Sequence, residues 1–234
     1  IPVKQQSGSS SSTGIPATYT GIFDKIRNLF ATTEAARMSG FTKNHFSFRN
    51  REGQCPACEG SGEVRISMDF LSDLILPCEA CNGRRYRDEV LEIRWNGKTI
   101  DEVLKMTFSE AYGLFSGVKG LAESILLLER VGLGYLVLGQ PLNTLSGGEF
   151  QRISLASGLM RRANGSNLYL FEEPTAGLHP LDVQFMVHLF HELADQGHTL
   201  YIIEHDPAVI RETDYIIDLG PGAGDEGGQV VAKG

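Results

Sequence analysis

The chain has 234 residues, of which 41% are hydrophobic and 21% are charged, and its formal net charge is −8. This composition excludes a disordered chain, which carries fewer apolar residues, and a membrane-embedded one, which carries fewer charges. Its apolar runs are far shorter than the roughly 20 residues that cross a bilayer, and residues 1–20 lack the pattern of a secretory signal. We therefore expect a cytoplasmic protein without a membrane segment. The acidic charge argues against nucleic-acid binding over the whole surface, but not against a local basic patch.

The first half of the chain predicts a linker and a helix, followed further along by a hairpin. A Ser/Gly-rich stretch over residues 7–14 indicates a flexible linker. Apolar residues recur at helical spacing over 22–30. Residues 90–100 predict a β-hairpin around the Asn96-Gly97 turn. Further helices are expected over 109–115 and 121–131.

The last third of the chain alternates between helices and short apolar strands. Helices are predicted over 146–162 and 181–196, strands over 167–171, 199–203 and 214–219, and a last hairpin near Gly227-Gly228. The strands are continuous runs of Val, Ile and Leu, as expected where both faces of a sheet are buried. This alternation predicts an α/β fold with a parallel sheet.

All four cysteines lie in one block and form two C-x-x-C pairs. The pairs begin at Cys55 and Cys78, and each half repeats the pattern C-x-A-C-x-G. Together Cys55, Cys58, Cys78 and Cys81 offer the four thiolates that tetrahedral zinc prefers. Disulfides or a redox dithiol are the alternatives, but both are rare as a compact four-cysteine cluster in a cytosolic protein. The sequence therefore predicts a structural zinc module.

Arginine residues gather around this module. They are Arg49, Arg51, Arg65, Arg84, Arg85 and Arg87. Aromatic residues lie among them, and guanidinium and aromatic groups together suit phosphate contact and base stacking. The cluster is equally compatible with a solvated rim balanced by nearby Asp and Glu. Both interpretations stay open on these residues alone.

The string Leu145-Ser-Gly-Gly-Glu149 predicts a helix start that faces phosphate. Ser146 is placed as an N-cap, and Glu149 three residues later completes a capping box. Gly147 and Gly148 leave the first-turn amides open to phosphate oxygens at the positive end of the helix. Capping alone does not require two glycines, which weaken a helix.

Carboxylates and a histidine follow two neighbouring predicted strands. Glu172 and Glu173 end one strand, and His205 comes just after the next. The carboxyl ends of parallel strands are where α/β sheets bind ligands. One carboxylate is suited to hold Mg²⁺ through water, the other to orient an attacking water, and His205 to contact a γ-phosphate.

The printed sequence contains no Gly-x-x-x-x-Gly-Lys-Ser/Thr motif. Gly97-Lys98-Thr99 is the nearest match, but residue 92 is Glu rather than Gly. It also follows Asn96 in a predicted hairpin instead of opening a helix after a strand, so we reject it as a phosphate loop.

The order of these motifs resembles the UvrA family of ABC ATPases, the DNA-damage-recognition subunits of bacterial nucleotide excision repair. Beyond the zinc block, the resemblance is carried by Pro16–Gly21, Gly132–Tyr135, Leu138–Pro141, Leu145–Glu149, Glu173–Thr175, Gly177–His179, Ile203–His205 and Ile217–Pro221. It runs from about residue 16 to the C-terminus and corresponds to the second nucleotide-binding half of such a protein.

The resemblance implies a fold, cofactors and partners. The fold would be an ABC-type P-loop NTPase core, incomplete because the Walker A part is absent, with an inserted zinc module and a helical signature subdomain. The implied division is 1–40 (Q-loop region), 41–100 (zinc module and hairpin), 101–145 (helical signature subdomain) and 146–234 (ATPase core). Zinc, ATP and Mg²⁺ are the implied cofactors. Damaged double-stranded DNA, a UvrB-like protein and a second copy of the intact protein are the implied partners.

The resemblance also assigns residue roles. Ser146, Gly147, Gly148 and Glu149 would form the signature that closes over ATP held by the other nucleotide-binding domain. Glu173 would be the catalytic glutamate, His205 the switch histidine, and Gln5 falls near the expected Q-loop glutamine. Glu172 stands where the family carries Asp at the Walker B position. Because Walker A would precede residue 1, we expect the chain to be part of a longer ATPase and inactive alone.

Other classes fit the motifs less well. A non-hydrolytic zinc module that binds DNA or a partner and a UvrA paralogue linked to drug resistance remain alternatives. A DnaJ-type chaperone domain would show four cysteine repeats and no Leu145–Glu149 motif. A transporter ATPase has no place for the zinc insertion.

Overall fold

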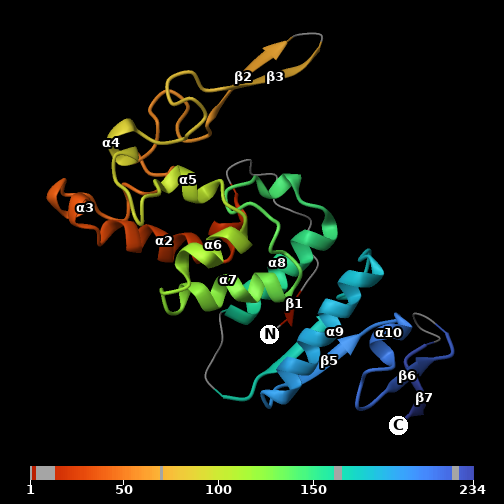
Figure 1. Cartoon of the computed structure of the whole chain (residues 1–234). Coiled ribbons are helices and arrows are strands. Elements are labelled where there is room, and N and C mark those ends of the chain that lie inside the picture. The colour runs from red at the N-terminus through yellow and green to blue at the C-terminus, as the bar shows by residue number, and fades with distance from the viewer. Residues whose placement is uncertain (1, 4–13, 69–70, 161–164, 223–226) are drawn as a thin grey trace. The chain divides into compact units, whose positions relative to one another are not determined.

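The computed structural model describes residues 2–3, 14–68, 71–160, 165–222 and 227–234 (Figure 1). The chain divides into two compact units, Gln6–Arg162 and Ala163–Gly234 with Ile1–Gln5. We call them the helical unit and the sheet unit, and describe each by itself. The predicted division of the chain into four parts remains a prediction.

The helical unit consists of short helices and one β-hairpin. Its helices are α1 (Pro16–Tyr19), α2 (Ile22–Ala31), α3 (Glu34–Met38), α4 (Asp88–Leu91), α5 (Ile100–Leu104), α6 (Phe108–Phe115), α7 (Leu121–Arg130), the 3₁₀ helix η1 (Leu142–Thr144) and α8 (Gly147–Met160). The helices predicted over 22–30, 109–115, 121–131 and 146–162 are thus confirmed with boundaries that shift by at most one residue, except that the end predicted at 162 lies outside the described residues. Helix α2 buries the apolar residues Ile22, Phe23, Ile26 and Phe30, the spacing from which it was predicted.

Aromatic side chains join the zinc block to the helices of this unit. The ring of Phe46 lies 5.5 Å from that of Phe30 on α2, and the ring of Phe48 lies 5.7 Å from that of Phe23. Tyr86, on the far side of the cysteines, packs edge-on against Phe48 at 6.2 Å. The cysteine block is therefore packed on the aromatic core of the helical unit.

The segment between the two cysteine pairs is a β-hairpin. Strand β2 (Glu63–Met68) pairs antiparallel with β3 (Leu71–Pro77), with Val64 opposite Leu76 and Ile66 opposite Leu74. Figure 1 shows the hairpin projecting from the cysteine loops. The hairpin thus returns the chain so that the second C-x-x-C pair lies beside the first.

The hairpin predicted over residues 90–100 is wrong in most of its length. Asn96-Gly97 does form the tight turn, since Trp95 and Lys98 exchange backbone hydrogen bonds of 2.9 and 3.0 Å. On either side, however, the chain forms helices α4 and α5 instead of strands. Helix α5 is set by a capping box in which Thr99 and Glu102 bond each other's backbone N–H, a signal that outweighs the apparent alternation.

The sheet unit has a parallel three-stranded sheet, as predicted. The strand order is β1 (Pro2–Val3), β4 (Leu168–Glu172), β5 (Thr199–Ile203), and both pairings are parallel. Helix α9 (Pro180–Asp195) follows β4, and α10 (Pro207–Ile210) follows β5. An antiparallel pair, β6 (Ile217–Gly220) and β7 (Gln229–Lys233), ends the chain and confirms the predicted last hairpin.

The two faces of strand β4 differ in burial. Tyr169 and Phe171 are buried, and Phe171 packs on Phe190 of α9 with 5.1 Å between ring centroids. Leu168 and Leu170 on the opposite face are 48% and 46% exposed. The expectation of strands buried on both faces therefore holds for one face of β4. It does not hold for β5, whose described residues are partly or fully exposed.

Helix length bears on the predicted lack of a membrane segment. The longest described helix, α9, has 16 residues, and roughly 20 apolar residues are needed to cross a bilayer. Across the described ranges, no helix combines the length and apolar character of a membrane span.

Candidate metal and nucleotide sites

The four cysteines come together as the sequence predicts. Their sulfur atoms all lie within 4.8 Å of one another, and Cys55, Cys78 and Cys81 are buried. The two loops that carry them share a backbone conformation. In each, the residue after the second cysteine has a positive φ, 50° at Glu59 and 51° at Asn82, and a glycine with positive φ follows. The sequence repeat is therefore also a structural repeat that aims two thiols at one point.

The spacing of the sulfurs fits a zinc ion. Tetrahedral zinc with Zn–S bonds of about 2.3 Å places its sulfurs about 3.8 Å apart. The Sγ atoms of Cys58 and Cys81 are 3.7 Å apart, too far for the roughly 2.05 Å bond of a disulfide, and all four cysteines are free. The backbone N–H of Gly62 donates to Cys58 Sγ at 3.3 Å, as expected around a metal-bound thiolate.

Burial gives Cys81 a high proton affinity in the metal-free state. It raises the pKa of the Cys81 thiol to about 12. A metal ligand must be deprotonated, so binding at this site releases protons and stabilises the fold around it. The four-cysteine cluster could hold a metal, and zinc is the ion that its thiolate set favours.

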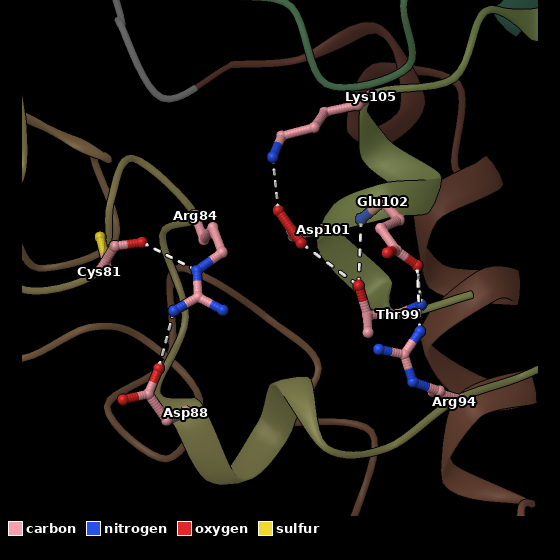
Figure 2. Close-up of polar contacts among 8 residues, drawn as sticks. All are labelled: Cys81, Arg84, Asp88, Arg94, Thr99, Asp101, Glu102 and Lys105. Carbon is pink, nitrogen blue, oxygen red and sulfur yellow. Dashed lines mark hydrogen bonds and ion pairs between the residues drawn. The ribbon is translucent and has the colours of Figure 1, made fainter. Parts of the chain in front are cut away.

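Two of the predicted DNA-contacting arginines hold the cysteine loops in place. Arg84 donates through Nε to the carbonyl of Cys81 at 3.1 Å and through Nη2 to Asp88 Oδ1 at 3.0 Å (Figure 2). Arg85 donates through Nη1 to the carbonyl of Gly139 at 3.2 Å, and its guanidinium carbon lies 5.2 Å from the centre of the Phe48 ring. Both side chains are half-buried. Their contacts are thus structural in the isolated chain.

The remaining arginines are placed differently. Arg49, Arg51 and Arg87 are exposed; Arg49 lies 5.9 Å from the Phe48 ring centre, and Arg87 donates to the carbonyl of Arg51 at 3.1 Å. The side chain of Arg65 lies outside the described residues. A DNA-contacting role for these arginines stays a prediction.

The rejected phosphate-loop candidate forms a turn and a helix cap. Thr99 Oγ1 accepts from the N–H of Glu102 at 3.3 Å, and Glu102 Oε2 accepts from the N–H of Thr99 at 2.9 Å. Figure 2 also shows Arg94 beside Glu102, and Lys105 donating to Asp101 at 2.7 Å. Contrary to the sequence argument, Thr99 does open a helix. That helix has only five residues, and its cap already uses the Thr99 hydroxyl and amide.

The signature string starts a helix, as predicted. Glu149 Oε2 accepts from the N–H of Ser146 at 2.7 Å, and Ser146 Oγ accepts from the N–H of Glu149 at 3.3 Å, which completes the capping box. Ser146 and Gly147 are exposed, so the first turn of α8 is open to a ligand. A contact that the sequence did not reveal also fixes Glu149, because the Tyr135 hydroxyl donates to its Oε1 at 2.6 Å. Burial tends to raise the pKa of Glu149, but the hydrogen bonds from Tyr135 and Ser146 outweigh it and lower that pKa.

The acidic pair and the histidine belong to one edge of the sheet unit. Glu172 pairs with Ile203 in the parallel register, so β4 and β5 end together. The N–H of Glu173 donates to the carbonyl of Ile203 at 2.9 Å, and Glu173 has a φ of 43°, in the left-handed region. His205 is 79% exposed. Glu172, Glu173 and His205 therefore follow adjacent strand ends, as the sequence predicts.

One carboxylate at this edge was missed by the sequence argument. The side chain of Glu204 is only 3% exposed, and its two oxygens accept hydrogen bonds from Thr175, His205 and Asp206. Burial raises its pKa, but these hydrogen bonds outweigh that effect and lower it. Glu204 lies inside the Ile203–His205 string that carries the resemblance, but residue type and spacing alone assigned it no role. The predicted Q-loop residue Gln5 lies outside the described residues.

The start of α8 and the acidic edge of the sheet are compatible with the ABC-type class of nucleotide-binding proteins predicted from the motifs. The relatives of the chain are UvrA proteins. The chain is 50% identical to UvrABC system protein A of Streptococcus pyogenes serotype M1 and 51% identical to that of Thermus thermophilus. Each match covers 94% of this chain and 23% of the relative.

A solved structure agrees. The crystal structure of UvrA2 from Deinococcus radiodurans superposes with a TM-score of 0.87 at 42% identity, covering 100% of this chain and 29% of that one. No protein-family model matches the chain. The predicted resemblance to UvrA is thus confirmed. The chain is UvrA-like and spans about a quarter of the length of these curated relatives.

Proposed function

We propose that the chain is part of a UvrA-like ATPase that recognises damaged double-stranded DNA in nucleotide excision repair. The observation that carries this proposal is the 50% identity to UvrABC system protein A over 94% of the chain. The placement of the motif residues supports it, because the exposed start of α8 and the acidic sheet edge both suit nucleotide chemistry. A UvrB-like protein and a second copy of the intact protein are the partners, and the cytoplasm is the location that we propose with it.

The sheet edge would supply the hydrolytic groups. The Glu173 carboxylate accepts a hydrogen bond from the water that attacks the γ-phosphate, which orients that water, and it then takes up the proton. His205 donates a hydrogen bond to the γ-phosphate. Glu172 has the charge to hold Mg²⁺ through water, and Mg²⁺ when bound neutralises phosphate charge. The left-handed backbone of Glu173 fits such a role, since strained residues persist mainly where the surrounding structure holds them for function.

The start of α8 would close an ATP site of another nucleotide-binding domain. Ser146, Gly147 and Gly148 present a hydroxyl and first-turn amides to the phosphates, and the helix dipole favours negative charge there. Glu149 holds this turn in shape through the capping box rather than by touching phosphate itself. Because no Walker A motif is present in the printed sequence, we expect hydrolysis only in the longer protein.

The cysteine cluster would hold zinc through Cys55, Cys58, Cys78 and Cys81, and the exposed arginines beside it would contact DNA. Zinc when bound supplies structural stability rather than chemistry, because all four ligand positions are taken by protein. In this arrangement, Arg84 and Arg85 fix the module, while Arg49, Arg51 and Arg87 face solvent.

The test compares the intact wild-type protein with Glu173→Gln, measuring ATP hydrolysis with and without damaged DNA. We expect DNA to modulate the wild-type rate, and the variant to lose at least about 100-fold in kcat while still binding ATP. The exposed acid Glu212 gives a matched control, Glu212→Gln, which should keep wild-type activity. A wild-type protein without DNA-modulated hydrolysis would contradict the proposal and favour a non-hydrolytic zinc module.

A further inference from the structure

Glu204 is a buried carboxylate with an unusually complete set of hydrogen-bond donors. Its Oε1 accepts from the N–H of Thr175 at 2.9 Å and from the Thr175 hydroxyl. Its Oε2 accepts from the N–H of His205 at 2.8 Å and of Asp206 at 3.1 Å. An ionised carboxylate has about four lone-pair sites, so these four donors fill its capacity. The group is therefore held in one orientation.

The four donors come from two different loops of the sheet unit. Thr175 belongs to the loop after β4, two residues beyond Glu173, whereas His205 and Asp206 begin the loop after β5. The carbonyl of Ile203, next to Glu204, accepts from the N–H of Glu173 at 2.9 Å. The two loops that carry Glu173 and His205 are thus joined by two contacts. One is the pair of hydrogen bonds from Thr175 to Glu204, and the other is the hydrogen bond from Glu173 to Ile203.

The chemistry of the junction requires a carboxylate. Three backbone N–H groups and one hydroxyl all act as donors toward Glu204, so an acceptor is needed at both oxygens. A glutamine of the same shape has a single acceptor oxygen, and its NH₂ group would face N–H donors from one of the loops. A buried donor without a partner is costly, so one loop would have to move.

The junction also bears directly on the two groups assigned to hydrolysis. Glu204 Oε2 lies 3.9 Å from His205 Nδ1, and its hydrogen bond to the His205 N–H sets the backbone from which that ring projects. On the other side, Thr175 lies within the turn that starts at Glu173, which is closed by the Ala176 N–H donating to the Glu173 carbonyl at 3.1 Å. Glu173 itself is in the left-handed region, a conformation that a non-glycine residue keeps only when its neighbours are fixed.

We propose that Glu204 is a positioning residue for ATP hydrolysis: it clamps the loop that carries Glu173 to the loop that carries His205. This role rests on the proposed ATPase function. Glu204 does not touch the phosphates. It acts by holding the water-orienting carboxylate and the phosphate-contacting histidine in register, and a displacement of about 1 Å at such groups costs on the order of 100-fold in rate.

The experiment measures steady-state ATP hydrolysis by the intact protein at a temperature well below its melting point. Glu204→Gln should lower kcat by about 10- to 100-fold while the KM for ATP changes less than about threefold, because Glu204 itself does not touch the nucleotide. Thr175→Val should lower kcat in the same direction but less, and Thr175→Ser, which keeps the hydroxyl, should retain it. Glu212→Gln is the matched control, since it removes an exposed carboxylate of the same unit.

Amide hydrogen exchange supplies a readout that does not depend on activity. In Glu204→Gln, exchange should speed up at Thr175, His205 and Asp206 and stay unchanged in α9. An active wild type whose Glu204→Gln variant keeps its kcat overturns the positioning role alone. So does a variant that melts earlier but hydrolyses at the wild-type rate below its melting point. A wild type without ATPase activity overturns the proposed function, and this role with it.

Discussion

Substitutions of Arg85 can distinguish a structural role from a DNA-contacting role for the arginines around the cysteine loops. Its guanidinium joins the cysteine block to the loop before the signature helix, through the Gly139 carbonyl at 3.2 Å and the Phe48 ring at 5.2 Å. Its own carbonyl accepts from the N–H of Cys55 at 2.8 Å, which ties its backbone to the cluster. Arg85→Ala removes both side-chain contacts and leaves the backbone tie.

The expected cost follows from these two contacts. A hydrogen bond from a charged donor contributes about 1.5–3 kcal/mol, and a cation–π contact at a partly exposed site about 0.5–1 kcal/mol. Because the Arg85 side chain is only half-buried, we take the lower ends and expect a loss of about 2 kcal/mol in the free energy of unfolding. With a urea dependence of about 2 kcal/mol per molar, the midpoint should fall by about 1 M.

The chain carries a convenient probe for this measurement. Trp95 is its single tryptophan, lies in the helical unit and stacks on Phe115 with ring centroids 5.0 Å apart. Urea unfolding followed by Trp95 fluorescence therefore reports on the unit that contains Arg85. Arg51→Ala is the control, because the Arg51 side chain is exposed, and we expect it to change stability by less than about 0.5 kcal/mol.

Arg85→Lys separates the two roles. Lysine keeps the positive charge that a phosphate contact needs but lacks the planar fork that stacks on Phe48. A structural Arg85 predicts that Lys and Ala variants lose similar stability. Coincident urea midpoints for wild type and Arg85→Ala would refute this reasoning. If Arg85→Ala instead lowered only the affinity for DNA, and reduced the slope of log affinity against log salt concentration by about 1, the DNA-contacting interpretation would replace the structural one.

Three further expectations follow from the sites. Cys81→Ser should reduce bound zinc from about one ion per chain to well below one, as measured by elemental analysis after dialysis; full retention would argue against a four-thiolate site. Tyr135→Phe removes the hydroxyl bonded to Glu149, so the pKa of Glu149 should rise toward its ordinary value in an NMR titration, with a stability loss of at most about 1 kcal/mol. Because the folded pKa of Glu204 is lowered, its stabilising effect should be present near neutral pH and fade as the pH falls below about 4. Calorimetry should thus show Glu204→Gln less stable than wild type at pH 7, with a smaller difference at pH 3; a constant difference would contradict this.

The sequence predicted those parts of the fold that local patterns determine. Helix α2 followed from apolar spacing, and strand β5 was predicted with the bounds that the structure shows. The error over residues 90–100 arose where two signals competed. The Asn96-Gly97 turn is real, but the Thr99–Glu102 capping box that follows it starts a helix, and apolar Ile100, Val103 and Leu104 have helical spacing. A tight turn specifies a reversal of the chain without specifying strands on both sides.

The candidate sites also include residues that local patterns predict and residues that they do not. Cys55 and its three partners could be predicted because metal ligation imposes residue type and spacing together. Glu204 could not, since its role depends on donors contributed by Thr175 from another loop, and only the folded chain brings them within hydrogen-bond distance. Residues that act through contacts distant in sequence leave no pattern for a single sequence to show.

The arginines show the limit of reasoning from charge. In a chain of net charge −8, a group of guanidinium side chains around a zinc module suggested contact with an anionic partner. In the structure, Arg84 donates a hydrogen bond to the carbonyl of Cys81, and Arg85 donates one to the carbonyl of Gly139. A phosphate contact through these same N–H groups would have to break the hydrogen bonds, whereas the Arg51 side chain is exposed. Under the proposed DNA-binding role, we therefore expect direct phosphate contacts at this module to come chiefly from its exposed arginines, Arg49, Arg51 and Arg87.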